Sequence, residues 1–182
     1  MKRFSEDIES ILVSEEEIDD IIEKTARQID EDYKDKNLLL LCILKGSVMF
    51  FGDLLKKITV PAEIDFMRVS SYSGTESSGT VRILLDVDHG KLKDCDVLVV
   101  EDIIDSGRTL TYLCEYLKFK GAKSVRTCTL LDKPDRRVTD FVPDYTGVMI
   151  PDEFVVGYGL DYDEKYRTLP YIGILKPEVY EK

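Results

Sequence analysis

Residues 97–110 read VLVVEDIIDSGRTL, a run of four apolar residues that passes directly into acidic residues and then into small ones. The apolar run is typical of a strand that is buried on both faces of a sheet. Glu101 and Asp102 follow it at once, and Asp105 comes three positions later. Because ligands of open α/β sheets bind beyond the carboxyl ends of the strands, we expect these carboxylates to emerge there, at a binding site.

A tight turn follows the acidic residues and leads into a predicted helix. Its residues are Asp105, Ser106, Gly107, Arg108 and Thr109. Backbone N–H groups at a helix N-terminus carry partial positive charge and bind a phosphate monoester without a lysine. Carboxylates beside a phosphate cost free energy unless they hold a metal ion or accept hydrogen bonds from sugar hydroxyls. The stretch therefore indicates a phosphorylated sugar, with its cis-diol on Glu101 and Asp102 and Mg²⁺ nearby. The alternative is an ordinary strand, turn and helix with a solvated acidic end.

Hydrophobic periodicity elsewhere predicts alternating helices and strands. Ser14 and Glu17 form a capping-box pattern ahead of an amphipathic helix over residues 15–33. Further helices are predicted over residues 50–58 and from residue 110 to a stop at Gly121, and strands at residues 38–44, 64–70, 81–86, 97–100, 125–131, 148–150, 154–156 and 172–175. This order is typical of an α/β domain with a Rossmann-like, mostly parallel sheet flanked by helices. We expect one domain over residues 1–182, with a core of about 38–150 and a small hood formed by the N- and C-terminal segments.

The composition argues against several classes of function. Hydrophobic residues make up 43% and charged residues 34%, as in globular proteins. The longest apolar run, residues 38–44, is far shorter than the ~20 residues of a membrane-spanning helix. A net charge of −11 is unfavourable for binding nucleic acid through its phosphates. Because the first residues contain no apolar signal segment and the four cysteines form no CxxC pair, we expect a cytoplasmic protein with free thiols.

Other catalytic and nucleotide-binding motifs are missing from the sequence. His89 is the only histidine, and no nucleophile motif accompanies it. The chain has no G-x-x-x-x-G-K-[ST] loop, and the segment Gly157-Tyr158-Gly159 lacks the third glycine of a dinucleotide loop. The sequence therefore gives no support to histidine-centred catalysis or to binding of a nucleoside triphosphate or NAD.

Residues 97–110 closely resemble the signature of the type I phosphoribosyltransferases, which bind phosphoribosyl pyrophosphate. Four more segments resemble the hypoxanthine-guanine branch of this family, in its bacterial form, and occur in the family's order. They are Leu44-Lys45-Gly46-Ser47, Ser71-Tyr72, residues 131–137 (LDKPDRR) and residues 151–162 (PDEFVVGYGLDY). The resemblance implies the type I phosphoribosyltransferase fold. It also implies a transferase of purine salvage that makes IMP or GMP, plus pyrophosphate, from phosphoribosyl pyrophosphate and hypoxanthine or guanine.

The same resemblance assigns roles at the sugar and its diphosphate. Asp105 would be the catalytic residue that accepts the purine proton, and Glu101, Asp102 and residues 105–109 would bind the phosphoribosyl group. The pyrophosphate would bind at a loop that often contains a cis peptide bond, which here contains Lys45 and Gly46. It would also bind at an arginine, which here is Arg167. Mg²⁺, the implied cofactor, would be held by Glu101, Asp102 and Asp161.

At the base, the resemblance assigns Lys133 to the 6-oxygen of the purine, Phe154 to stacking and the backbone of Val155 to the purine edge. Ser71 and Tyr72 would belong to a flexible loop that closes over the site. The family further implies a homodimer or homotetramer, with no nucleic-acid or membrane partner.

Simpler explanations exist for several of these residues when each is taken alone. Lys133, Arg136 and Arg137 could form a solvated basic turn, Phe154 could be a core residue, and Asp161 could be a solvated surface acid. Two other functions also fit the sugar-binding segment. One is a transferase that prefers xanthine or another base, and the other is a non-catalytic regulator that senses phosphoribosyl pyrophosphate.

Overall fold

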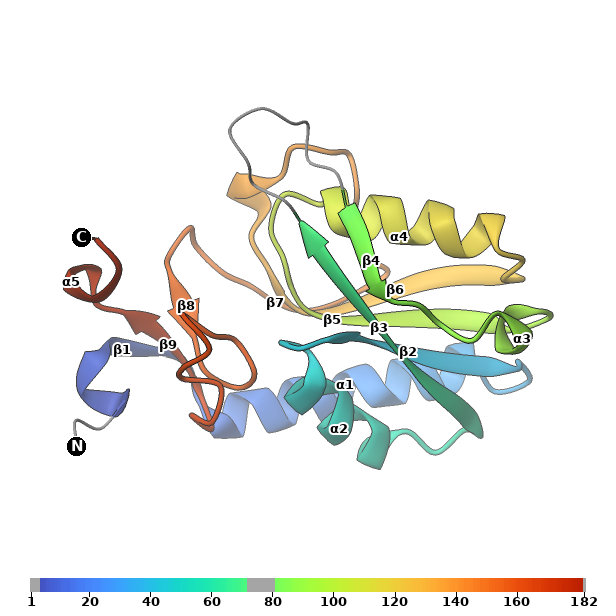
Figure 1. Cartoon of the computed structure of the whole chain (residues 1–182). Helices are drawn as coiled ribbons and strands as arrows, with labels where there is room; N and C mark the ends of the chain where they lie inside the picture. The colour runs from blue at the N-terminus through green and yellow to red at the C-terminus, as the bar shows by residue number, and fades with distance from the viewer. Residues whose placement is uncertain (1–3, 72–80, 182) are drawn as a thin grey trace.

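The computed structural model describes residues 4–71 and 81–181, and the strands in this part of the chain form two separate sheets (Figure 1). The strands are β1 Ile8–Val13, β2 Leu38–Leu44, β3 Ala62–Ser71, β4 Val81–Leu85, β5 Asp96–Ile104, β6 Ser124–Asp132, β7 Tyr145–Met149, β8 Val155–Val156 and β9 Ile172–Leu175. The helices are α1 Glu15–Asp32, α2 Val48–Lys57, α3 His89–Leu92, α4 Arg108–Phe119 and α5 Pro177–Tyr180, with short 3-10 turns at Phe4–Asp7 and Pro134–Arg136. None of the helices in the described residues is long and apolar enough to cross a membrane.

The larger sheet has the strand order β4-β3-β2-β5-β6-β7 among the described residues. Strands β3, β2, β5, β6 and β7 run parallel, and β4 pairs antiparallel with β3 at one edge. Parallel strands need crossover connections, which include α2 between β2 and β3 and α4 between β5 and β6. The prediction of an α/β fold with a mostly parallel sheet is therefore confirmed.

Helices cover both faces of this sheet because its central strands are apolar on both sides (Figure 1). Alternate residues of β2 belong to different core layers. Leu38, Leu40 and Cys42 pack with residues of α1 and α2, whereas Leu39, Leu41 and Ile43 pack with residues of α4. The continuous apolar run at residues 38–44 is thus explained by burial on two sides.

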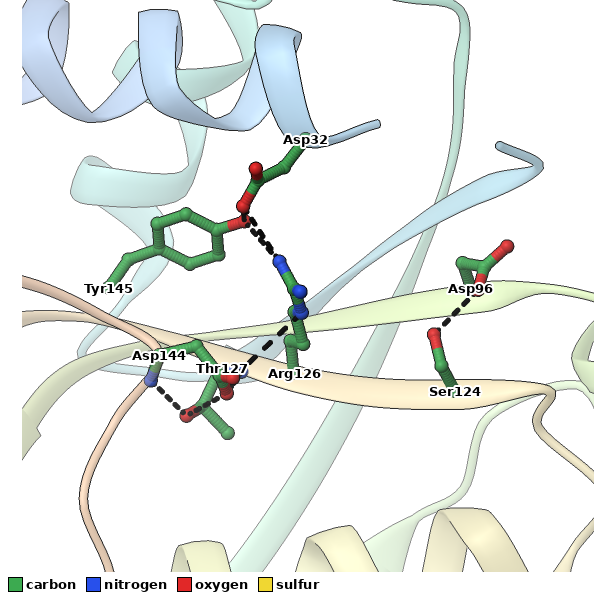
Figure 2. Close-up of polar contacts among 7 residues, drawn as sticks. All are labelled: Asp32, Asp96, Ser124, Arg126, Thr127, Asp144 and Tyr145. Atoms are coloured by element: carbon green, nitrogen blue, oxygen red, sulfur yellow. Dashed lines mark hydrogen bonds and ion pairs between the residues drawn. The ribbon is translucent and has the colours of Figure 1, made fainter. Parts of the chain in front are cut away.

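Helix α1 begins at the predicted capping box and is fastened at its other end by a polar cluster (Figure 2). The carboxylate of Glu17 accepts the N–H of Ser14 at 2.8 Å. At the far end, Asp32 accepts a hydrogen bond from Arg126 at 2.7 Å and one from the Tyr145 hydroxyl at 2.6 Å. These contacts connect α1 to the first residues of β6 and β7, at the edge of the sheet opposite the strand carboxyl ends.

The two ends of the chain meet in the smaller sheet, in which β9 pairs antiparallel with both β1 and β8. Strand β1 was not predicted from the sequence. Its residues are mostly exposed, so they lack a clear alternation of buried and exposed positions, and its partner β9 lies at the other end of the chain. Figure 1 shows this sheet beside the carboxyl ends of the larger one.

Candidate functional site

The carboxyl ends of the parallel strands bring together segments that are far apart in sequence. Strand β2 ends just before Lys45, β5 just before Asp105 and β6 just before Lys133. Neighbouring strands end at the same edge, where Ile104 of β5 is paired with Asp132 of β6. The resemblance assigns Lys45 to the pyrophosphate, Asp105 to the purine proton and Lys133 to the purine 6-oxygen, and all three follow strands that end at this edge of the sheet.

Strand β5 is longer than the sequence predicts, and this corrects the expected position of Glu101 and Asp102. Both were expected beyond the strand. Strand β5 instead continues to Ile104, because its pairing with β6 extends that far and places Glu101 opposite Thr129. The two acidic residues thus belong to the strand, and only Asp105 follows it.

Glu101 and Asp102 are carboxyl groups held away from water. Asp102 is 9% exposed, and its Oδ1 accepts the N–H of Ile103 at 2.9 Å. Although part of Glu101 is accessible, its Oε2 is shielded and has no hydrogen-bond partner among the described residues. Burial raises the pKa of Asp102 to about 6. Burial and the neighbouring Asp102 carboxylate raise the pKa of Glu101 well above its usual value. A cation or a hydroxyl donor would satisfy such a pair.

The loop after β2 fits between β5 and the segment that follows β8. Its Leu44–Lys45 peptide bond is cis, as the resemblance implies. A Cβ atom on Gly46 would lie 1.6 Å from Asp102 Oδ2, so only glycine permits this approach. From the other side, a Cβ atom on Gly159 would lie 2.0 Å from the Gly46 carbonyl oxygen, and Gly159 has a φ of 98°. The backbone of the loop is therefore held directly against Asp102.

A polar cavity of about 260 Å³ opens at this loop. Its lining includes five residues to which the resemblance assigns a role: Lys45, Gly46, Asp102, Asp161 and Arg167. Arg68 and Glu164 also line it, and sequence reasoning missed both. A signal for Arg68 was present, because it is a charged residue near the end of a predicted strand. No local signal could identify Glu164, which reaches across 119 residues to Lys45.

Arg167 organises the charges of the cavity. One of its terminal nitrogens, Nη1, donates to the carbonyl of Gly159 at 2.6 Å. The other, Nη2, lies 2.8 Å from the carboxylate of Asp161 and 3.3 Å from that of Glu164. The Nζ atom of Lys45 lies 2.9 Å from the second oxygen of Glu164. Cationic and anionic side chains thus alternate around the cavity.

The three carboxylates to which the resemblance assigns a metal do not form one cluster. Within the described residues, no group of three or more acidic, histidine or cysteine side chains could hold a metal ion, and Asp161 is paired with Arg167. Asp102 and Asp161 nevertheless line the same cavity. Mg²⁺ is usually bound by one or two carboxylates together with substrate phosphates. The positions of Asp102 and Asp161 are therefore compatible with Mg²⁺ bound by one or two carboxylates together with a phosphorylated ligand.

The turn before α4 has the form of an anion-binding loop. Gly107 is the N-cap residue, with a φ of 82° in the left-handed region. In the described structure no side chain caps α4, and its first turn contains no acidic residue. Ser106 and Thr109 are half-buried, and Arg108 is exposed. The first N–H of α4, that of Arg108, makes only a long hydrogen bond of 3.4 Å to Ser106 Oγ, so this helix start suits an anion such as a phosphate.

Arg137 holds this turn in place through hydrogen bonds and an ion pair. It donates to the carbonyl of Asp105 at 3.0 Å and to the carbonyl of Phe141, and it forms an ion pair with Asp132. Its side chain is 13% exposed. The simpler interpretation of a solvated basic turn is therefore wrong for Arg137.

Lys133 and Asp105 belong to one charged group at the ends of β5 and β6. Lys133 is buried, and its Nζ donates to the carbonyl of Glu153 at 2.5 Å and lies 3.9 Å from the Asp152 carboxylate. Burial lowers the pKa of Lys133. The exposed carboxylate of Asp105 lies 3.0 Å from Arg136 Nε, and Arg136 also contacts Asp152. Sequence reasoning did not identify this link between Arg136 and Asp105.

Phe154 is an exposed member of an aromatic group rather than a core residue. It is 37% exposed, stacks on Tyr180 and contacts the ring of Tyr162 edge to face, with centroids 5.5 Å apart. The next residue, Val155, is buried in β8 and pairs with Ile174. Phe154 and Lys133 lie close together, since Lys133 donates to the residue before Phe154.

The closing loop lies largely outside the described residues. Ser71 is the last residue of β3, where it pairs with Val81 of β4. Tyr72 lies outside the described residues.

Known proteins are similar to the chain over most of its length. A family model described as phosphoribosyl transferase domain matches residues 11–163. The chain is 54% identical over 182 residues to the hypoxanthine-guanine phosphoribosyltransferase of Lactococcus lactis, with 100% of this chain and 98% of that protein covered. It is 51% identical over 177 residues to the bifunctional protein TilS/HprT of Listeria monocytogenes, with 97% of this chain but only 27% of that protein covered. A crystal structure of a hypoxanthine phosphoribosyltransferase from Staphylococcus aureus superposes with a TM-score of 0.92 at 49% identity, covering 98% of this chain and 97% of that one.

Proposed function

The chain belongs to the phosphoribosyl transferase family, and from this premise we propose that it transfers the 5-phosphoribosyl group of phosphoribosyl pyrophosphate to hypoxanthine or guanine. The products are IMP or GMP and pyrophosphate. The chain has the type I phosphoribosyltransferase fold and is a transferase of purine salvage.

One structural observation supports this proposal most directly: the order of the subsites follows the order of the strands. The loop with Lys45 and Gly46 follows β2, the carboxyl pair and the anion-binding turn belong to the end of β5, and Lys133 follows β6. These three strands are adjacent in the sheet. A diphosphate, a ribose 5-phosphate and a base could therefore bind side by side, in the sequence in which they are joined.

The reaction breaks the bond between ribose C1 and a diphosphate oxygen and forms a bond between C1 and a purine nitrogen. Positive charge develops on the sugar ring and negative charge on the leaving group, so that charge stabilisation matters more than a protein nucleophile. Lys45 and Arg167 would stabilise the leaving diphosphate, together with N–H groups of the loop at Gly46. Asp105, which follows β5, would accept the proton that the purine nitrogen loses.

The sugar would be held by groups with unmet hydrogen-bonding capacity. The 5′-phosphate would occupy the N-terminus of α4, over Ser106, Gly107, Arg108 and Thr109. The two ribose hydroxyls would donate to Glu101 and Asp102, because burial raises the pKa of both carboxyl groups and leaves Glu101 Oε2 without a hydrogen-bond partner among the described residues. Binding of the diol thus satisfies two carboxyl groups that the free protein leaves poorly solvated.

We propose Mg²⁺ as the cofactor because a diphosphate beside carboxylates needs a countercharge. Asp102 and Asp161 would hold it, and the bound ion would neutralise charge on the leaving group. For Asp161 this requires a partial release of Arg167, with which it is paired.

Base selection would depend on a buried donor. Lys133 can turn from the carbonyl of Glu153 to the 6-oxygen of hypoxanthine or guanine. Adenine presents an amino group at this position, and a buried lysine facing another donor would lose its partner. Phe154 would stack on the base, and the backbone of Val155 would contact its edge.

We also propose, from the family, that the protein is cytoplasmic and forms a homodimer or homotetramer. Each subunit would be one domain with a hood, and Ser71 and Tyr72 would belong to its closing loop. Light scattering on the purified protein tests the oligomeric state.

The function is tested by mixing the protein with Mg²⁺, phosphoribosyl pyrophosphate and one purine at a time, and following the change in absorbance. Turnover is expected with hypoxanthine and guanine, and little with adenine. It should cease when EDTA removes the metal. Absence of turnover with every purine would refute the transferase proposal and favour a sensing role, whereas full activity in EDTA would refute the cofactor.

A further inference from the structure

The carboxylate of Glu164 lies between the two cationic side chains that we assign to the diphosphate. Its Oε1 is 2.9 Å from Lys45 Nζ, and its Oε2 is 3.3 Å from Arg167 Nη2. All three residues line the same cavity. In the free protein, a carboxylate therefore occupies part of the place in which phosphate oxygens would bind.

Backbone conformation, rather than burial, directs Glu164 into this position. Its side chain is 65% exposed. Asp163 and Glu164 have φ values of 52° and 58°, in the left-handed region that is uncommon for residues other than glycine. The N–H of Glu164 donates to Asp161 Oδ2 at 2.9 Å, which fixes the turn. The turn is thus held in a conformation that presents this one side chain to the cavity.

We propose that Glu164 competes with the diphosphate for Lys45 and Arg167, which weakens diphosphate binding and speeds the release of pyrophosphate. The inference rests on the proposed function, from which it takes the position of the diphosphate. Exposed ion pairs contribute little net free energy, so Glu164 can leave when a more highly charged anion arrives. While it stays, its negative charge repels that anion.

Glu164→Gln tests this inference because it removes the charge and keeps the size of the side chain. Asp163→Asn is the matched control: it changes the net charge equally, but Asp163 is 75% exposed and pairs with Lys165 at 3.1 Å. Binding of inorganic pyrophosphate with Mg²⁺ to each full-length protein is measured by titration calorimetry. We expect E164Q to bind about threefold to tenfold more tightly than the unaltered protein, and D163N to differ by less than about twofold. The gain should shrink at high salt, which screens exposed charges.

If the unaltered protein turns over purines, the proposed function stands whatever the Glu164 variant does. Two results would then overturn the inference alone. One is an E164Q variant that binds pyrophosphate no more tightly than the unaltered protein. The other is an equal gain in D163N, which would make the effect one of net charge. An unaltered protein that turns over no purine would refute the proposed function itself, and the inference with it.

Discussion

The ring of Tyr180 lies on the ring of Phe154, with the two centroids 4.6 Å apart and the ring planes 18° apart. Tyr180 is the last residue of α5, and Phe154 directly precedes β8. The C-terminal helix therefore covers one side of the side chain to which we assign purine stacking.

Tyr180→Leu should raise the KM for hypoxanthine by about fivefold, because an aromatic pair contributes about 1 kcal/mol beyond the area it buries. The loss of Tyr180 would let Phe154 adopt other rotamers and would leave the sugar subsites unchanged. Steady-state kinetics with each substrate varied in turn measures the effect. Tyr180→Phe keeps the ring and serves as the control. An equal rise in the KM for phosphoribosyl pyrophosphate would show that α5 affects the whole site.

Asp105→Asn should lower the turnover rate by about 10²- to 10⁴-fold, since it removes the proton acceptor and keeps the shape of the side chain. Binding of phosphoribosyl pyrophosphate, measured by calorimetry, should change little because the N–H groups of the turn remain. If that binding were lost instead, Asp105 would be a sugar-binding residue and not the base.

Lys133→Met should reduce kcat/KM for hypoxanthine and guanine by about 10- to 100-fold, which is the effect of losing one hydrogen bond from a charged donor. Methionine keeps much of the apolar stem, which suits a buried position. The KM for phosphoribosyl pyrophosphate should stay within about twofold of the original value. A melting temperature measured alongside shows whether the loss of the bond to Glu153 has altered the fold.

Asp32→Asn should destabilise the protein in a pH-dependent way. The hydrogen bond from Tyr145, then that from Arg126, holds the pKa of Asp32 below its ordinary value. A carboxyl group with a depressed pKa in the folded state stabilises the fold above the unfolded pKa, about 3.9, and loses this contribution as pH falls through the lower, folded-state value. The substitution should therefore cost about 1 kcal/mol at pH 7, since Asp32 is partly exposed.

Urea unfolding at a series of pH values measures this effect. The gap between the two proteins should stay constant from pH 7 to about pH 5 and narrow in more acidic solution. Asp35→Asn, at an exposed position nearby, controls for the loss of a negative charge. A gap that does not depend on pH would mean that the ionised form of Asp32 is not what stabilises the fold.

Local patterns predicted much of the secondary structure. The strand at residues 38–44 and the strand at 172–175 have the predicted bounds, and α1 has the predicted capping box. Such elements depend on residues that are close in sequence. The signals are apolar runs, helical periodicity and a capping pair three positions apart. Strand β1 and the extension of β5 to Ile104 were not predicted, because both depend on pairing with strands elsewhere in the chain.

The candidate site likewise has features that the local sequence indicated and features that only the tertiary structure decided. The apolar run ending at Val100, the acidic residues after it and the small residues of the turn indicated by themselves a phosphorylated sugar, since each is a short-range chemical requirement. Only the tertiary structure decided that Glu101 and Asp102 lie within the strand, that Glu164 lies against Lys45 and that Tyr180 lies on Phe154. These contacts depend on which strands and turns meet at one sheet edge. Sheet pairing and packing between distant segments determine that arrangement, and a pattern of neighbouring residues does not record it.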